Sequence, residues 1–211
     1  MKRRVVISLL SALALSAFVG ITPVAAAASF EETAKTFVDE LASQAIHELT
    51  DKSVPRAERI KRFRAFFNAH FAVKGIGKWI LGRHWRKATQ AEQEEYLDLF
   101  EDLIIVSYVD RFASYVGEPL HVHKTLVLNE NNATVYSDIH QGGGMETLDV
   151  NWRVARKDGV HKIVDVVVEG TSMSSTLRSD FSSIIRQRGG KVSGLIEALR
   201  EKTASLSGNT H

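Results

Sequence analysis

The hydrophobic pattern of the chain changes twice along its length. Before residue 117, apolar side chains recur three and four residues apart, which is typical of amphipathic helices. Between about 120 and 169 they alternate with polar side chains, as in strands that bury one face. After Gly170 the helical period returns. Helices, then strands, then helices predict an α+β fold.

Capping and helix-breaking residues give the bounds of the predicted helices. Ser-x-x-Glu and Thr-x-x-Glu capping boxes open two of them, and a proline opens another at its first turn. Glycines end or interrupt the remaining ones, among them Gly75 and Gly77, which break the helical pattern. The helices are expected at about 30–49, 55–71, 76–81, 90–116, 173–188 and 192–204.

Tight turns join the predicted strands into an antiparallel meander. Asp158-Gly159 is a strong hairpin signal, and Gly142 to Gly144 form another turn. We expect four strands, at about 120–129, 133–140, 147–154 and 160–169, with Gly170 ending the meander. In the third strand Val150 and Trp152 share one face, and Val164, Val166 and Val168 of the fourth are expected on the same side. Helices packed on such a four-stranded sheet can enclose an apolar pocket.

The long helix at 90–116 carries an apolar stripe that changes face. In its first half, Tyr96 and Phe100 lie opposite a row of acidic side chains. In its second half, the apolar residues lie on the other side of the helix: Ile105, Tyr108, Val109, Phe112 and Tyr115. A rotated stripe needs two different partners, and the second is either protein or an apolar ligand.

The first 28 residues have a composition of their own. A basic start at Lys2 to Arg4 precedes an uncharged apolar run at 5–21, and small residues follow Pro23. This pattern predicts a cleavable secretory signal peptide, because the apolar run is at the short edge of what spans a bilayer. We therefore expect export to the periplasm, a single domain at 29–204 and a flexible tail at 205–211.

Composition removes several classes of function. With 44% apolar and 25% charged residues the chain is composed like a globular protein, and without cysteine it has no disulfide, thiolate zinc site or cysteine nucleophile. The leader holds three of the 27 basic residues and none of the 25 acidic ones, so the mature chain is near neutral. A near-neutral exported protein is not expected to bind nucleic acid.

Candidate catalytic or metal-binding groups are few. His121 and His123 lie on one strand face but lack a third ligand, so we interpret them as a solvent-facing pair. Asp149 and Asp165, on neighbouring strands, offer an acid/base pair, although solvated carboxylates are the favoured interpretation. The serines near Ser172 are typical of a helix cap. We predict no metal, no cofactor and no enzymatic activity.

Residues 59–87 hold nine Lys and Arg residues, no Asp or Glu, and several aromatic residues. An acidic stretch follows from Glu92. Two interpretations stay open: a basic rim that meets lipid phosphates or an acidic partner, and a segment neutralised within the fold. Under the first, Arg83, Arg86 and Lys87 are candidate docking residues.

Two blocks of sequence resemble a known family. The first is Gly75-Ile-Gly-Lys-Trp-Ile-Leu-Gly-Arg-His-Trp-Arg-Lys-Ala-Thr89, with Tyr96-Leu-Asp-Leu-Phe100 and Tyr108. The second is Asp165-Val-Val-Val-Glu-Gly-Thr-Ser-Met173 with Arg178 and Phe181, where Thr171 replaces a commonly apolar residue. With the leader and the element order, they resemble the MlaC family of periplasmic phospholipid shuttles, also called toluene-tolerance auxiliary proteins.

The resemblance implies a carrier of phospholipid. Its partners would be an outer-membrane lipoprotein-porin complex and the lipid-binding subunit of an inner-membrane ABC transporter, with acyl chains held between sheet and helices. We expect a monomer. Alternatives are a chaperone-like module that binds apolar polypeptide and an α+β hydrolase. The candidate lipid-binding residues are Trp79, Leu81, Ile105, Tyr108, Val109, Phe112, Tyr115, Val135, Ile139, Val150, Trp152, Val166, Val168 and Met173.

Overall fold

The computed structural model describes residues 28–115, 119–140 and 147–208. The elements follow in the order α1 (Phe30–Leu49), α2 (Arg56–His70), α3 (Val73–Leu81), the 3-10 helix η1 (Gly82–Lys87), α4 (Gln90–Ala113), β1 (His121–Asn129), β2 (Asn132–His140), β3 (Thr147–Lys157), β4 (Val160–Val168), β5 (Thr171–Ser172), α5 (Met173–Gln187) and α6 (Val192–Gly208). The α+β class is confirmed. The predicted leader, apart from Ala28, and the turn at 142–144 lie outside the described residues. Among the described helices, none is long and apolar enough to cross a membrane.

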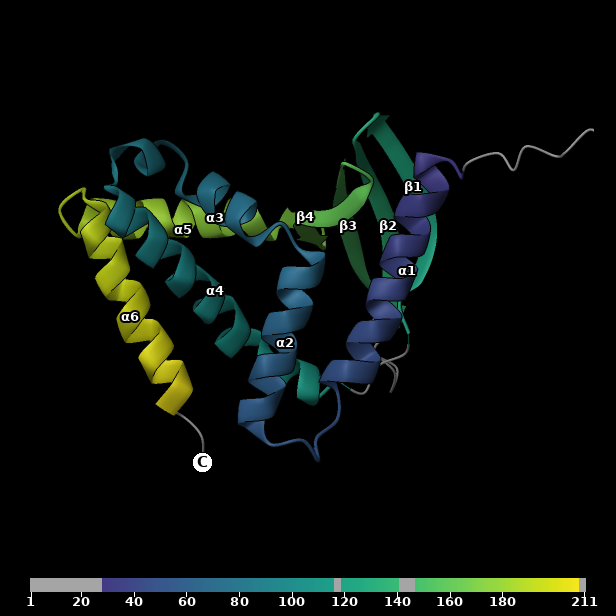
Figure 1. The fold of residues 1–211 in the computed structure, drawn as a ribbon, viewed down its shortest axis with the longest axis horizontal. Coiled ribbons are helices and arrows are strands. Elements are labelled where there is room, and N and C mark those ends of the chain that lie inside the picture. Colours follow the sequence, from purple (N-terminus) through teal and green to yellow (C-terminus); the bar gives the residue numbers. More distant parts are fainter. Residues whose placement is uncertain (1–27, 116–118, 141–146, 209–211) are drawn as a thin grey trace, which may run out of the picture.

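The described strands form one antiparallel sheet in the order β1-β2-β3-β4-β5 (Figure 1). The prediction of four strands was wrong, because Glu169-Gly170 turns the chain instead of ending the meander. Both residues have positive φ, 48° and 74°, like Asp158-Gly159 at 51° and 78° in the preceding hairpin. Two successive positive φ values are the geometry of a tight hairpin turn, and β5 is the short strand that follows.

A bulge in β4 changes which of its residues face inward. Arg153 pairs with Asp165, but the next residue, Val154, pairs with Ile163. The extra residue, Val164, has no partner in β3, so Ile163 takes the inner position. Ile163 is fully buried. The expectation that Val164 shares the inner face is therefore wrong, since strict alternation fails at a bulge.

Helix α3 begins at Val73, and Gly75 and Gly77 lie inside it. The prediction that they break the helix was wrong at both positions. Gly77 lets α3 approach α4 closely: a Cβ atom there would lie 2.8 Å from Cδ2 of Leu97. The Tyr96 hydroxyl donates to the Gly77 carbonyl over 2.9 Å, and burial raises the pKa of Tyr96.

Two other helix ends differ from expectation. Helix α4 ends at Ala113, short of the predicted residue 116. Helix α6 continues to Gly208, so 205–208 are helical where a frayed tail was predicted; 209–211 lie outside the described residues. Both predicted capping boxes, which open α1 and α4, are present.

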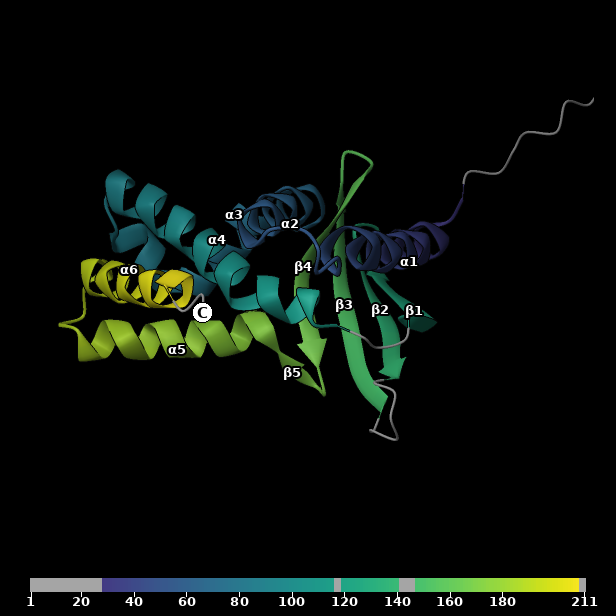
Figure 2. The ribbon, with the colours of Figure 1, turned by 90° about the horizontal axis from the view of Figure 1, so that it is seen from below.

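The buried side chains form two cores with α4 running between them. The sheet core joins α1, α2 and the second half of α4 to the sheet and includes Ile105 and Val109. The helical core joins α3, α5 and α6 to the first half of α4 and includes Tyr96 and Phe100. Figures 1 and 2 show α4 crossing from one group of elements to the other. The rotated stripe of α4 is thus confirmed: its two halves pack against different partners.

Histidine side chains are built into the junction between α1 and β4. The His161 ring stacks on Phe37 and Phe30, with centroids 5.6 Å and 5.7 Å apart. Its Nε2 atom is buried without a hydrogen-bond partner. Burial, followed by the nearby Arg156 charge, lowers the pKa of His161 below its ordinary 6.5. Burial, followed by Lys162, likewise lowers the pKa of His70, which lies beside Phe37.

Acid is therefore expected to destabilise this junction. Because the folded pKa of His161 is lowered, the unfolded chain binds more protons below about pH 6.5, and stability present above that pH is lost as the pH falls. In urea unfolding between about pH 7.5 and about pH 5, H161F is expected to lose less stability than the wild type. The exposed-site variant H47Q should behave as the wild type does. If H161F loses as much stability as the wild type does, then His161 does not supply the pH dependence.

Candidate ligand-binding cavity

A cavity of about 300 Å³ lies where the inner sheet face meets α1, α2, α4 and the start of α5. Helix α4 contributes a single row with four-residue spacing: Phe100, Ile104, Tyr108 and Phe112. This spacing places all four side chains on one helix face. Tyr115 extends the row just beyond the helix end. The row reaches from the helical core to the edge of the sheet core, so the cavity lies where the two cores meet.

The sheet supplies the opposite wall. Trp152 of β3 and Val166 of β4 are direct register partners and both line the cavity, together with Ile139 of β2 and Val168 of β4. The Trp152 indole N–H donates to the Ser137 hydroxyl over 3.0 Å, and that hydroxyl donates to the Val150 carbonyl. The polar atom of the indole is therefore bound within the sheet, and its apolar ring lines the cavity.

Helices α1 and α2 close the cavity with aliphatic and aromatic side chains. Leu41, Ala42 and Ala45 come from α1, and Phe63, Phe66 and Phe67 come from α2. The α2 rings pack on their neighbours, with Phe63 centred 5.2 Å from Phe112 of α4. Small alanines on one side and packed aromatic rings on the other leave space that protein atoms do not fill.

One carboxylate, that of Asp165, lines the cavity, and both of its oxygens already accept hydrogen bonds. It accepts hydrogen bonds from the Ser172 hydroxyl at 2.6 Å and the Ser174 backbone N–H at 3.1 Å. Arg153 Nη1 lies 3.1 Å from the same carboxylate. Asp165 thereby ties the start of α5 to β4 and β3. This network fixes the wall and leaves no lone carboxylate facing the cavity.

Asp149 and Asp165 do not form the acid/base pair that the sequence offered. Asp149 pairs with Asp138 across the sheet, whereas Asp165 pairs with Arg153. The two carboxylates proposed as partners therefore do not meet. In the part of the chain that the structure describes, no group of three His, Asp or Glu side chains is placed to hold a metal ion.

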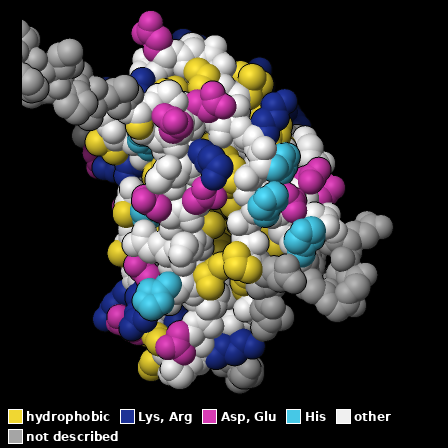
Figure 3. Space-filling model, turned by 90° about the vertical axis from the view of Figure 1, so that its right-hand side faces the viewer, with side chains coloured by type: hydrophobic (Ala, Val, Ile, Leu, Met, Phe, Trp, Pro, Cys, Tyr) yellow, Lys and Arg dark blue, Asp and Glu magenta, His cyan; other side chains and the backbone are white. Residues whose placement is uncertain are grey.

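The predicted histidine pair has a third member. His121 and His123 are exposed, and with His140 they surround Asp138, at N–O distances of 3.3, 4.0 and 3.5 Å. Figure 3 shows histidine side chains gathered on this face. Sequence reasoning missed His140 because it lies on the next strand. Asp138, which these histidines surround, faces Asp149 across the sheet.

The structure brings eight of the fourteen predicted lipid-binding residues to the cavity wall. They are Tyr108, Phe112, Tyr115, Ile139, Trp152, Val166, Val168 and Met173. Five others are buried away from the wall: Leu81, Ile105, Val109, Val135 and Val150. Trp79 is not on the wall either and is 48% exposed.

Two of the residues predicted on α4 lie one position along the chain from residues that line the cavity. Ile105 and Val109 pack in the sheet core, and the cavity is lined by the adjacent row, which includes Ile104. A single-residue step turns a helix by 100°, and both rows are apolar, so periodicity cannot distinguish them. The phenylalanines of α2 were also missed, because their stripe is typical of an ordinary amphipathic helix.

The two interpretations of the basic segment apply to different halves of it. Arg59 lies 3.0 Å from Asp110, and Arg64 lies 2.7 Å from both Glu101 and Asp102. In the α2 part, Arg59 and Arg64 thus pair with acidic side chains of α4, while Lys61 and Arg62 pair with Glu58 of α2 itself. Across the described residues, Arg83, Arg86 and Lys87 of η1 form no ion pair.

A cavity lined almost entirely by aliphatic and aromatic side chains suits an apolar ligand. The family model described as MlaC protein matches residues 38–201. The chain therefore belongs to the MlaC family, and the resemblance seen in the sequence is confirmed.

A solved structure shares the fold. It is the phospholipid-binding protein from Ralstonia solanacearum, determined in complex with a phospholipid. The two chains are 24% identical, with a TM-score of 0.69, and the match covers 85% of this chain and 99% of the other. At this identity the likeness concerns the arrangement of the helices and strands.

Proposed function

We propose that the protein is a periplasmic phospholipid carrier whose cavity holds acyl chains. The observation that carries the proposal is the apolar wall formed by the α4 row and the Trp152–Val166 pair. Each methylene moved from water into such a wall contributes about 0.8 kcal/mol, so acyl chains are retained without covalent chemistry. Membership of the MlaC family and the phospholipid bound by the Ralstonia protein support the same ligand.

The size of the cavity bears on how much lipid it takes. Its volume of about 300 Å³ is at the lower end of the range for small-molecule sites. Two long acyl chains need more space, so loading requires the walls to move apart. The boundary between the two cores is the natural place for this movement, because the cavity already separates them there.

The leader-like first 28 residues and membership of the family support a periplasmic location for the carrier. There it would take lipid from one membrane and deliver it to the other, working as a monomer. The expected partners are an outer-membrane lipoprotein-porin complex and the lipid-binding subunit of an inner-membrane ABC transporter. Because the mature chain is near neutral, we expect no nucleic-acid partner.

Native mass spectrometry of the protein purified from the periplasm tests the proposal. The expected spectrum shows the mature chain with one phospholipid mass added, and solvent extraction returns that lipid intact. A lipid-free protein that suppresses aggregation of unfolded polypeptides would favour the chaperone-like alternative. Release of fatty acid from added lipid esters would instead indicate a hydrolase. Either of these two results would overturn the carrier function.

A further inference from the structure

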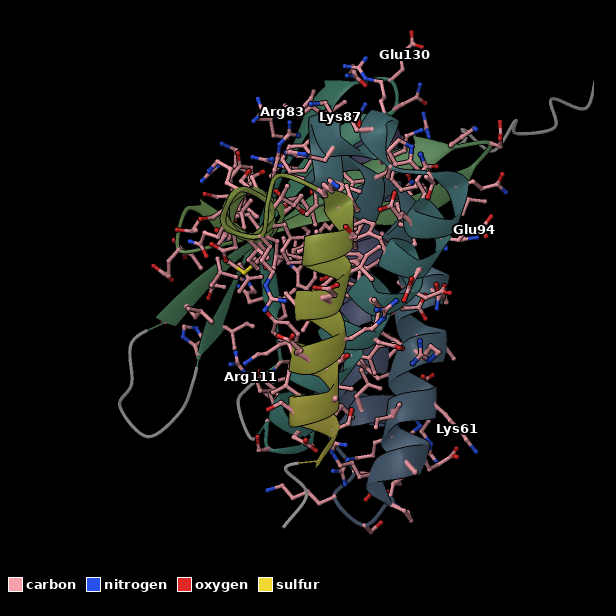
Figure 4. All side chains as sticks on the ribbon, turned by 90° about the vertical axis from the view of Figure 1, so that its left-hand side faces the viewer. Lys61, Arg83, Lys87, Glu94, Arg111 and Glu130 are labelled. Carbon is pink, nitrogen blue, oxygen red and sulfur yellow. The ribbon has the colours of Figure 1, made fainter. Side chains whose placement is uncertain are left out.

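An exposed tryptophan lies among unpaired cations where α3 meets η1. The Trp79 surface consists of Trp79, Lys78, Arg83, Arg86, Lys87 and Arg186. Trp79 is 48% exposed, which is a large fraction for a large aromatic side chain. Figure 4 shows Arg83 and Lys87 close together at one end of the molecule, with Glu94 farther down the side.

Neighbouring side chains hold members of this surface in place. The Arg178 guanidinium lies 4.7 Å over the Trp79 ring and donates to the Trp79 carbonyl over 3.0 Å, which holds the indole in place. Lys78 lies 5.5 Å from the Trp85 ring centroid. Gly82, with φ of 55°, turns the chain from α3 into η1 and leaves room for Arg178, whose Nη2 would lie 2.8 Å from a Cβ atom there.

The cations of this surface have no acidic counterpart. From Arg59 to Ala91 the chain contains no Asp or Glu, and the next acidic residue, Glu92, is engaged in the Thr89 capping box. Within the described ranges none of the five cations of the Trp79 surface forms an ion pair, whereas Arg59, Arg64 and Arg200 all do. Exposed cations clustered without an acidic neighbour create a positive potential, so their clustering points to an anion outside the fold.

The cations of this surface also act on His84. Its side chain, which comes from η1 itself, is buried, and its Nε2 atom has no hydrogen-bond partner. Burial first, and then the charges of Arg83, Lys87 and Arg186, lower the pKa of His84. This agrees with the closeness of Arg83 and Lys87 on η1 (Figure 4).

We infer that the Trp79 surface docks the protein on an anionic lipid bilayer. Tryptophan is enriched at the level of lipid head groups, where its ring meets the acyl boundary and its N–H stays in the polar layer. Lysine and arginine around it reach lipid phosphates. An exposed indole surrounded by cations is the combination found in side chains that anchor proteins at a membrane interface, and we therefore assign the surface to a bilayer.

The position of the surface connects docking to the cavity, and to this extent the inference rests on the proposed carrier function. Ile76 lies one helical turn before Trp79 and lines the cavity. Leu177, the neighbour of Arg178, also lines it. Docking through Trp79 would therefore bring this end of the cavity to the membrane surface, where a lipid can enter or leave.

Flotation with vesicles tests the docking surface in the full mature protein. The wild type is expected to bind vesicles of phosphatidylcholine and phosphatidylglycerol in equal amounts at least about tenfold more tightly than vesicles of phosphatidylcholine alone. Added salt should weaken this binding, because salt screens exposed charges. The combined variant R83E/R86E/K87E should lose at least about tenfold in affinity for the anionic vesicles.

Matched variants distinguish the effect of the Trp79 surface from the effect of the protein's net charge. K52E/K157E/K202E makes the same change in net charge at exposed lysines elsewhere and should bind like the wild type. W79A should bind several-fold more weakly, whereas L128A, which removes a side chain that is 60% exposed, should not. Melting temperatures should stay nearly unchanged, since exposed charges contribute little to stability.

Several outcomes would overturn the inference. One is equal binding of the wild type to both kinds of vesicle, and another is an equal loss in the two triple variants. Full vesicle binding by R83E/R86E/K87E together with lost lipid transfer to a membrane-protein partner would assign the surface to an acidic protein. Native mass spectrometry tests the carrier function separately. A lipid-free wild type that still binds anionic vesicles would refute the carrier function but support the docking surface.

Discussion

Replacing Ala42 by tryptophan is expected to empty the protein of phospholipid while leaving it folded. Ala42 lies on the α1 wall of the cavity and is only partly buried, so an indole there enters space that protein atoms do not fill. If the indole displaces even about four acyl methylenes, about 3 kcal/mol of binding is lost, or about two orders of magnitude in affinity. Native mass spectrometry of the periplasmic protein measures the lipid-bound fraction.

Ala57→Trp is the matched control. Ala57 is exposed on α2 and does not line the cavity, so this variant should carry lipid like the wild type. The indole of A42W replaces apolar ligand by apolar side chain, so its cost in stability should stay within the about 1–3 kcal/mol typical of overpacking. Wild-type lipid content in a folded A42W protein would show that the acyl chains bind elsewhere.

Removing the Asp165 carboxylate is expected to cost about 2–4 kcal/mol of unfolding free energy. Asp165 is 6% exposed and accepts hydrogen bonds from Ser172 and from the Ser174 backbone N–H. In D165A the buried Ser174 N–H loses its acceptor, and Arg153 loses its ion-pair partner. The start of α5 also loses the negative charge that stabilises a helix N-terminus. Urea unfolding near neutral pH measures the change.

The comparison for this prediction is Asp149→Ala on the neighbouring strand. Asp149 is exposed, and its hydrogen bonds to Glu169 run through its backbone, which the substitution keeps. D149A should therefore change stability by no more than about 0.5 kcal/mol. Equal losses in the two variants would mean that the Asp165 network does not hold α5 to the sheet. Because Asp165 lines the cavity, D165A should also release lipid more readily.

Asp165 shows why a sequence block can be recognised before its role is understood. The block from Asp165 to Met173 identified the family, yet nothing local predicted what Asp165 contacts. Arg153 meets it only because β3 and β4 pair in one register. Arg178, in the same family pattern, packs on Trp79, which lies far away in the sequence. Both contacts depend on elements that the fold brings together.

The residues of the cavity wall were predictable on strands, where only one face is apolar and can turn toward the helices. Trp152, Val166 and Val168 lie on the alternating face of their strands, and the structure places all three on the wall. On α4 two adjacent rows are apolar, and the packing of α1 and α2 decides which row is covered by protein. The row through Ile104 was left facing the cavity. A pattern along one helix contains no information about that choice.

By itself, the sequence determined the features that depend on near neighbours in the chain. These are the two capping boxes, the Asp158-Gly159 hairpin, the α+β order and the change of face along α4. Backbone hydrogen bonding and side-chain periodicity act over a few residues, so local residues suffice to set them. Only the tertiary structure decided the bulge that buries Ile163, the row of α4 that lines the cavity, and which cations find a carboxylate. Each of these depends on the distance between segments far apart in the sequence, and that distance is set by packing of the whole chain.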